Sequence, residues 1–408
     1  MKNGWKKSTI GDIGRVFNGN SISESKKKTH FEGLDKGVPY IGTKDVGFNH
    51  EIEYESGVKI PDGKQDGFKL APPNTVLVCA EGGSAGRKIA HTDREVFFGN
   101  KLFAICPTPP VDSRFVFYYC LAEDFTEQFK GAMAGLIGGV SLNKFKDISI
   151  SIPPLLEQQR IVAMLDKSFI AIAIAKANAE KNLQNARALL ESQLQSVFTQ
   201  RGPKWVEKPL VELCDPTRVI TYGVIKLGQE ILDGVPCLRT SNVRWLRIDT
   251  EGIKKIAPSL SSEYSRTILR GGEVLVNVRG TLGGVAVVPP EMAGWNVSRE
   301  VAVVPVDHSK VNPVFLSYLI GSGVSQQWLG GVKKGATYVG INIEDLRLLP
   351  VSAPTMDKQL EIISQLETLQ ASTQRLESIY QQKLNDFEEL KKSILQKAFN
   401  GELAGACS

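Results

Sequence analysis

Two long stretches of the chain repeat apolar residues at alternating steps of three and four, a pattern typical of coiled-coil helices. Helices of roughly 40 residues would each be about 60 Å long at 1.5 Å per residue. Because a helix with one apolar stripe is not stable alone in water, we expect each to bury its stripe against the other. The first stripe contains Val162, Leu165, Phe169, Ile172, Ala179, Leu183, Ala186, Leu190 and Val197, interrupted by Lys176 and Gln193. The second contains Ile362, Leu366, Leu369, Leu376, Tyr380, Phe387, Leu390 and Ile394, with Thr373, Lys383 and Lys397 as polar members.

The segment before each helix has the pattern of a mixed α/β domain. Short runs rich in β-branched residues, such as residues 75–80, 96–106, 272–278 and 301–306, alternate with clusters of Gly, Pro, Asn and Asp. This alternation predicts short strands joined by turns. Prolines at 153–154 and 350–354 mark the expected helix starts, because proline is tolerated in the first helical turn.

The second half of the chain repeats the first half in the same order. Matching segments are 37–39 and 234–236, 76–78 and 274–276, 83–86 and 280–283, 104–107 and 302–305, 140–143 and 339–342, 157–159 and 357–359, and 192–198 and 393–399. The spacing between partners drifts only from 197 to 201 residues. A collinear series of this kind indicates an internal duplication. The predicted order is therefore globular domain, long helix, globular domain, long helix.

The composition is that of a folded globular protein, with 42% apolar and 23% charged residues. A formal net charge of +5 suits a polyanionic partner but is weak support for one. The six cysteines show no C-x-x-C spacing, which favours buried thiols in the cytosol. No apolar run approaches eighteen residues and no signal peptide is apparent, so we expect a cytoplasmic protein that does not bind membranes.

The motifs that catalysis would need are missing. Residues 81–88 are rich in glycine but lack the spacing of a phosphate-binding loop. Residues 71–74 contain two prolines but lack the carboxamide and aromatic residues of an adenine methyltransferase loop. Pro61 and Asp62 open no nuclease-like motif, and the histidines (His30, His50, His91 and His308) are scattered. We therefore predict no catalytic residues, no metal site and no bound cofactor.

With its duplicated domains and two long helices, the chain resembles the specificity subunit family of Type I restriction-modification enzymes. Residues 148–162 (ISISIPPLLEQQRIV) are very similar to that family's junction between recognition domain and spacer helix, and residues 393–403 are similar to its C-terminus. The resemblance covers essentially the whole chain. The second junction departs from the pattern, because its prolines are further apart and Lys358 replaces the first glutamine.

This resemblance implies an α+β fold with two similar mixed α/β target-recognition domains, residues 1–152 and 203–350. It also implies that the helical regions 153–202 and 351–408 pack as an antiparallel coiled coil, giving an internal pseudo-twofold repeat. Each domain would recognise one half of an asymmetric bipartite site in double-stranded DNA, and the helices would set the gap. The implied partners are two modification subunits, which bind S-adenosylmethionine, and restriction subunits that cleave DNA. This chain itself would be non-catalytic.

Residue types that suit phosphates and base edges suggest candidate DNA contacts in both domains. The first domain offers Lys26, Lys27, Lys28, Thr43, Lys44, Ser84, Arg87, Lys88 and Lys101. The second offers Arg239, Thr240, Ser241, Asn242, Arg244, Arg279, Thr281, Arg299, Lys333, Lys334 and Tyr338. Two alternatives stay open: a non-catalytic coiled-coil adaptor whose globular domains bind protein, and a stand-alone methyltransferase or nuclease.

Overall fold

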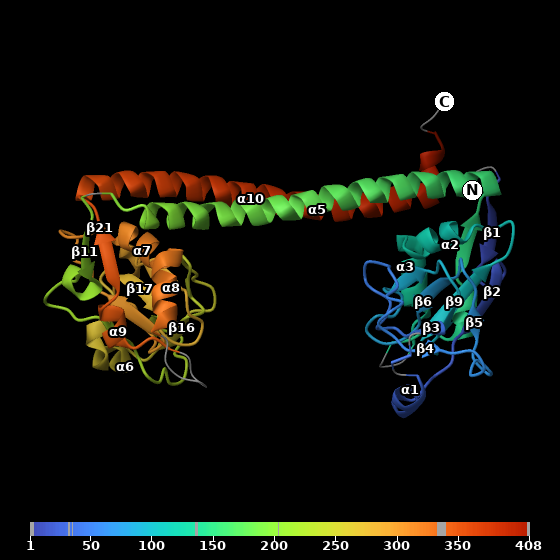
Figure 1. The fold of residues 1–408 in the computed structure, drawn as a ribbon, viewed down its shortest axis with the longest axis horizontal. Coiled ribbons are helices and arrows are strands. Elements are labelled where there is room, and N and C mark those ends of the chain that lie inside the picture. Colours follow the sequence, from blue (N-terminus) through green and yellow to red (C-terminus); the bar gives the residue numbers. More distant parts are fainter. Residues whose placement is uncertain are drawn as a thin grey trace. The chain divides into compact units, whose positions relative to one another are not determined.

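The computed structural model describes residues 4–31, 33–34, 36–134, 138–202, 204–332 and 340–405. It divides into two compact units: unit 1 is Met1–Ala179 with Gln382–Ser408, and unit 2 is Glu180–Gln381. Each unit consists of one mixed α/β head and parts of two long helices, α5 (Leu155–Thr199) and α10 (Met356–Phe399) (Figure 1). We call residues 4–152 head 1 and residues 204–353 head 2.

Head 1 contains two four-stranded sheets and one two-stranded sheet. The first sheet is antiparallel, in the order β2 (Gly14–Asn18), β9 (Leu102–Pro107), β6 (Val76–Cys79), β7 (Ile89–His91). The second has the order β4 (Lys59–Ile60), β3 (Val38–Ile41), β8 (Val96–Phe98), β5 (Leu70–Ala71), and in it β3 and β8 are parallel. In the third, β1 (Lys6–Thr9) pairs with β10 (Ser149–Ile152), which leads into α5. The helices of head 1 are α1 (Glu24–His30), α2 (Ser113–Cys120), α3 (Glu123–Ala132) and α4 (Leu142–Lys146).

Strand β6 lies between two hydrophobic clusters of head 1. Successive side chains of a strand point to opposite faces. Val76 and Val78 therefore pack with the apolar residues of α2, α3 and α4, whereas Leu77 and Cys79 pack against the second sheet. All four residues are fully buried. The run of apolar residues without alternation is explained by burial on both faces.

Head 2 has the same plan. Its antiparallel sheet has the order β12 (Thr221–Tyr222), β20 (Val301–Val304), β17 (Val274–Asn277), β18 (Val285–Val287). A second sheet has the order β16 (Lys254–Ile256), β13 (Val235–Leu238), β19 (Asn296–Val297), with β13 and β19 parallel. Strand β11 (Val206–Pro209) pairs with β21 (Pro350–Ala353), which leads into α10, and β14 (Val243–Arg244) forms a hairpin with β15 (Arg247–Ile248). The α-helices of head 2 are α6 (Pro258–Glu263), α7 (Pro313–Gly321), α8 (Gly323–Gly331) and α9 (Ile343–Arg347).

The α+β fold and the internal duplication are therefore confirmed, since equivalent strands pair in equivalent order in the two heads. Both heads close with a two-stranded sheet immediately before a long helix. Both also contain one parallel pair of strands, β3 with β8 and β13 with β19.

The two long helices run antiparallel within each unit, and they lie side by side (Figure 1). In unit 1, Arg160 near the start of α5 donates to the backbone oxygen of Leu403, while Lys176 Nζ lies 2.6 Å from Glu388 Oε1. In unit 2, Arg187 Nε lies 3.2 Å from Glu377 Oε2. The sequence separation between paired residues falls from the start of α5 to its end, as two antiparallel helices require.

The predicted apolar stripe of α5 is confirmed. Val162, Leu165, Ala179, Leu183, Ala186 and Leu190 are buried, and Phe169, Ile172 and Val197 are partly buried. Towards its end α5 also buries Leu194 and Phe198 in the core of head 2, which the heptad pattern did not predict.

The predicted stripe of α10 is confirmed only in part beyond Thr373: Tyr380, Phe387 and Ile394 are half-buried as predicted, but the other four members are exposed. Leu376 and Leu390 are 38% and 46% exposed, and Lys383 and Lys397 are also exposed. At these four positions, the buried or half-buried residue is instead the next one along the chain. These residues are Glu377, Leu384, Lys391 and Ala398. The long side chains of Glu377 and Lys391 can line the seam because their aliphatic parts pack while their charged ends reach partners.

A buried glutamine joins each head to the helix that follows it. Gln158 is 1% exposed; its Oε1 accepts from the backbone N–H of Asp112 at 2.8 Å and its Nε2 donates to the backbone oxygen of Pro153 at 2.8 Å. Asp112 is the N-cap of α2, so the contact connects α2 with α5. We call Gln158 and its equivalent in unit 2 the latch glutamines.

The latch glutamine of unit 2 is Gln359, also 1% exposed. Its Oε1 accepts from the backbone N–H of Asn312, the N-cap of α7, at 2.8 Å, and its Nε2 donates to the backbone oxygen of Pro354 at 2.9 Å. The expectation that Lys358 replaces Gln158 was therefore wrong. The second copy has one additional residue before this point, so the equivalent glutamine comes one position later.

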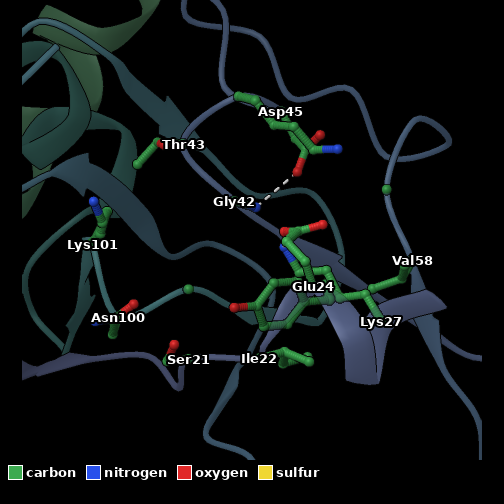
Figure 2. A pocket seen from close by; sticks show the side chains of 14 residues that line it. Ser21, Ile22, Glu24, Lys27, Gly42, Thr43, Asp45, Val58, Asn100 and Lys101 are labelled. Atoms are coloured by element: carbon green, nitrogen blue, oxygen red, sulfur yellow. Dashed lines mark hydrogen bonds and ion pairs between the residues drawn. The ribbon is translucent and has the colours of Figure 1, made fainter. Parts of the chain in front are cut away.

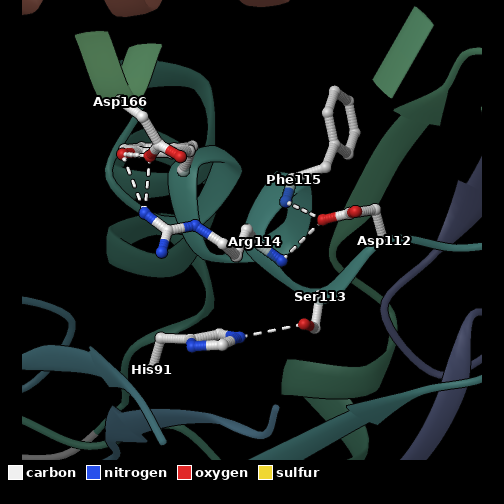
Figure 3. Close-up of polar contacts among 7 residues, drawn as sticks. His91, Asp112, Ser113, Arg114, Phe115 and Asp166 are labelled. Atoms are coloured by element: carbon white, nitrogen blue, oxygen red, sulfur yellow. Dashed lines mark hydrogen bonds and ion pairs between the residues drawn. The ribbon is translucent and has the colours of Figure 1, made fainter. Parts of the chain in front are cut away.

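Polar side chains of α2 add to the junction of head 1 with α5 (Figure 3). Arg114 Nη2 lies 2.5 Å from Asp166 Oδ1, and the hydroxyl of Tyr118 donates to the same oxygen. His91 Nε2 lies 2.9 Å from Ser113 Oγ. Burial is the main reason that the pKa of His91 is lowered to about 4, so its ring is neutral at pH 7.

Candidate nucleic-acid interface

The parallel strands of head 1 bring two polar loops to one edge. Because parallel strands end at the same edge of a sheet, the loop at 42–45 after β3 and the loop at 99–101 after β8 are neighbours. Asp45 is 4% exposed and fixes the first loop: its Oδ2 accepts from the backbone N–H of Gly42 at 2.8 Å and its Oδ1 from Ser56 Oγ at 3.0 Å. Thr43 and Lys44 are thereby displayed beside Lys101.

These loops line a cavity of about 550 Å³ (Figure 2). Lys27, Thr43, Lys44 and Lys101 all lie on its wall, although they come from separate parts of the sequence. Lys27 Nζ forms an ion pair with Glu24 at 2.7 Å. The structure therefore brings four of the predicted DNA contacts of head 1 together.

The turn between β6 and β7 adds further cations to this surface. Lys88 Nζ donates to the backbone oxygen of Thr43 at 2.9 Å, which connects the turn with the loop after β3. Arg87 is exposed, and both Arg87 and Lys88 lie over the ring of Phe48, at 5.0 and 5.1 Å from its centroid. Ser84 is half-buried in the same turn. Sequence reasoning missed Phe48, because a single aromatic residue next to a glycine carries no motif.

Head 2 presents equivalent loops at the ends of β13 and β19. The loop at 239–242 begins with Arg239, whose guanidinium donates to the backbone oxygen of Gly252 at 2.8 Å. Thr240 is half-buried and Ser241 is exposed. Gly280 lies close to this loop, since a Cβ added to it would lie 3.9 Å from Thr240 Oγ1. The predicted contacts at 239–241 and 279–281 are thus neighbours.

Asn242 has a structural role instead of the predicted contact with DNA. Its side chain is 1% exposed; Oδ1 accepts from the backbone N–H of Arg239 at 3.1 Å, and Nδ2 donates to the backbone oxygens of Asp249 and Glu251, each at 3.1 Å. It fixes its loop as Asp45 fixes the loop of head 1. We therefore remove Asn242 from the candidate contacts.

The remaining candidates are distributed around these loops. Arg279 lies over the ring of Tyr222, with 5.5 Å between guanidinium and centroid, and the backbone N–H of Arg299 donates to the oxygen of Val224 at 2.9 Å. The other candidates with exposed side chains are Lys26 and Lys28 on α1, Arg244 on the β14–β15 hairpin, and Thr281. Lys333, Lys334 and Tyr338 lie outside the described residues.

Within the described ranges, no group of three or more His, Cys, Asp or Glu residues is placed to hold a metal ion. The helices in the described part of the chain are also too short or too polar to cross a membrane. The five described cysteines are all free thiols.

The fold and these surfaces define a class of protein: a pair of homologous modules, each with polar loops at a sheet edge, joined by coiled-coil helices. The sequence profile of the Type I restriction modification DNA specificity domain matches residues 2–185 and 204–386, and the chain belongs to this family. The resemblance noted from the sequence is thus confirmed.

Several relatives match almost the whole chain. It is 24% identical to the specificity subunit of the Type I restriction enzyme EcoBI of Escherichia coli, over 98% of this chain and 86% of that one. It is 22% identical to the specificity subunit of the MjaVIII enzyme of Methanocaldococcus jannaschii, over 98% and 93% of the two chains.

Solved structures show the same fold. A chain from a study of complex assembly in the type I R-M system superposes with a TM-score of 0.76 at 18% identity, over 98% of both chains. The HsdS subunit from Thermoanaerobacter tengcongensis superposes with a TM-score of 0.62 at 19% identity, also over 98% of both chains.

Proposed function

We propose that this chain recognises an asymmetric bipartite site in double-stranded DNA, with head 1 on one half-site and head 2 on the other. The observation that carries the proposal is that the two heads share a backbone plan but present different side chains at equivalent loops. Glu81 and Arg279 form equivalent bridges, to Gly139 and Gly340, yet carry opposite charges. A carboxylate accepts from cytosine N4, whereas arginine donates to guanine. Two such heads would select two different sequences.

The proposed contacts with DNA are the candidate residues that remain exposed or half-buried at these loops. In head 1 they are Lys26, Lys27, Lys28, Thr43, Lys44, Ser84, Arg87, Lys88 and Lys101. Glu81, which the sequence did not suggest, joins them; its carboxylate lies 3.5 Å from Lys101 Nζ. In head 2 they are Arg239, Thr240, Ser241, Arg244, Arg279, Thr281 and Arg299. Lysine and arginine would neutralise phosphates, and the hydroxyl and guanidinium groups that reach the grooves would select bases.

The long helices would set the gap between the half-sites, because the length of an antiparallel pair is fixed by its residue count. The chain would act without catalysis of its own, together with two modification subunits and with restriction subunits. S-adenosylmethionine would bind to the modification subunits. The family to which the chain belongs and the absence of the usual catalytic motifs from its sequence support this assignment.

The decisive experiment measures binding to duplexes by the full chain purified with its modification subunits. The family resemblance implies that the modification subunits methylate adenine N6, so sequencing of modified adenines in the host first identifies the site. We expect preference for that site over a scrambled duplex at fixed salt, with an affinity that falls steeply as salt rises. Equal binding of both duplexes would refute sequence recognition. Binding that is weak and insensitive to salt would favour a coiled-coil adaptor for protein partners.

A further inference from the structure

Phe48 is an apolar residue of head 1 that the fold does not use. Its side chain is 56% exposed and belongs to none of the hydrophobic clusters found among the described residues. It lies in a short turn that is closed by the antiparallel bridge between Val46 and Ile52. The backbone N–H of Gly47 also donates to the oxygen of Glu51, at 2.9 Å.

The turn that carries Phe48 is anchored on both sides of the ring. Val46 is fully buried in the core of head 1. On the other side, His50 Nδ1 lies 3.1 Å from the backbone oxygen of Ile89. An exposed ring on an anchored turn is already held in place, so binding through it loses little conformational freedom.

Two cations lie against the ring of Phe48. Arg87 and Lys88 lie at 5.0 and 5.1 Å from its centroid. Lys88 also holds the backbone of Thr43, so the ring adjoins the loop after β3. A partner that covers the ring must therefore tolerate two positive charges beside an apolar contact. Duplex DNA does so, because it presents phosphates next to the flat and methylated surfaces of its bases.

The equivalent turn of head 2 uses its aromatic residue differently. There the β14–β15 hairpin carries Trp245, whose indole Nε1 donates to the backbone oxygen of Gly321 at 2.8 Å and whose ring packs against the core of head 2. The exposed residues of that hairpin are Arg244 and Arg247. Head 1 therefore presents an apolar ring where head 2 presents guanidinium groups.

We propose that Phe48 contacts base atoms of the half-site that head 1 recognises, while Arg87 and Lys88 bind phosphates beside it. This inference rests on the proposed function. Binding to DNA would bury the ring in one of two ways: it packs against a thymine methyl group, or it enters between two base pairs. Both contacts are apolar and select sequence without a hydrogen bond.

The test compares Phe48→Ala with the unchanged full chain, each purified with the modification subunits, on the recognised duplex. Loss of an aromatic contact with a base weakens binding roughly 5- to 150-fold. The dependence on salt stays the same, because no charge is removed, whereas Arg87→Ala lowers the salt slope by about one. Leu70→Ala is the matched control: Leu70 is 37% exposed on the same head, and we expect unchanged binding.

Two probes in the DNA separate the two forms of contact. Insertion between base pairs raises the fluorescence of 2-aminopurine in the half-site of head 1. Contact with a methyl group makes replacement of thymine by uracil weaken binding by the unchanged protein but not by Phe48→Ala. If Phe48→Ala binds as tightly as the unchanged chain, or if neither probe responds, the contact with bases is refuted. Failure of the unchanged chain to prefer its site would instead refute the proposed function.

Discussion

Replacing the latch glutamine Gln158 with alanine is expected to destabilise unit 1. The substitution removes the partner of one buried backbone group, the oxygen of Pro153 at 2.8 Å, and of two partly buried ones, the N–H of Asp112 at 2.8 Å and the oxygen of Pro110 at 3.3 Å. A buried polar group left without a partner costs about 1–3 kcal/mol. Because the contact to Pro110 is long and water can enter a cavity of this size, we expect a total loss of about 2–4 kcal/mol.

The assay is thermal unfolding of the full chain combined with hydrogen exchange of peptides from α2 and α5. For a unit of this size, the expected loss lowers Tm by roughly 5–15 °C. Exchange should increase at the start of both helices, because the latch connects them. Gln159→Ala is the matched control, because Gln159 is the next residue in the helix and its side chain is exposed. Equal Tm values for the two variants would refute the view that Gln158 fastens the head to its helix.

Two further predictions concern the helix pair and pH. Inserting seven residues after Ala179 and seven after Gln381 keeps the two helices in register and lengthens the pair by about 10 Å, or about three base pairs of DNA. Sequencing of modified adenines should show a longer gap with both half-sites unchanged, and altered half-sites would contradict the proposed spacer role. The second prediction is loss of stability in acid: the pKa of His91 in the folded chain is lowered to about 4, mainly by burial, so the unfolded chain takes up the proton first as pH falls below about 6.5. The contribution is fully present above that pH and is lost on the way down to about 4. Thermal unfolding should therefore show a smaller fall in Tm between pH 7 and pH 4.5 for His91→Gln than for the unchanged chain, and parallel curves would contradict this.

The heptad pattern predicted where the helices lie but could not fix the register of α10. After Thr373, a step of three leads to Leu376 and a step of four leads to Glu377, and both choices continue with a mixture of apolar and charged residues. In the structure Glu377 takes the seam position, and its carboxylate forms an ion pair with Arg187 on α5. That information lies in the partner helix, so no inspection of α10 alone could supply it.

At the candidate interface, too, the sequence predicted some features and missed others. The duplicated loops predicted where Thr43 and Thr240 lie, because backbone equivalence follows from repeated sequence. Residue type did not predict burial: Asn242 is of a type that suits base edges, but its amide is used by its own loop. Phe48 was not predicted at all, because an apolar residue gives no sign that its turn holds it in solvent.

Within each head, the residues that hold the fold together are separate from those that differ between the copies, and this separation explains how two copies of one fold could recognise two targets. The groups that hold the scaffold together are buried and equivalent: Gln158 and Gln359 at the helix junctions, and Asp45 and Asn242 inside the loops. The groups that differ between the copies, such as Glu81 and Arg279, lie at the rim of the sheets. Changing a residue at the rim removes little buried surface and leaves no buried partner unsatisfied, so its cost in stability is small. A head built in this way can therefore acquire a new preference for DNA while its attachment to the helices is unchanged.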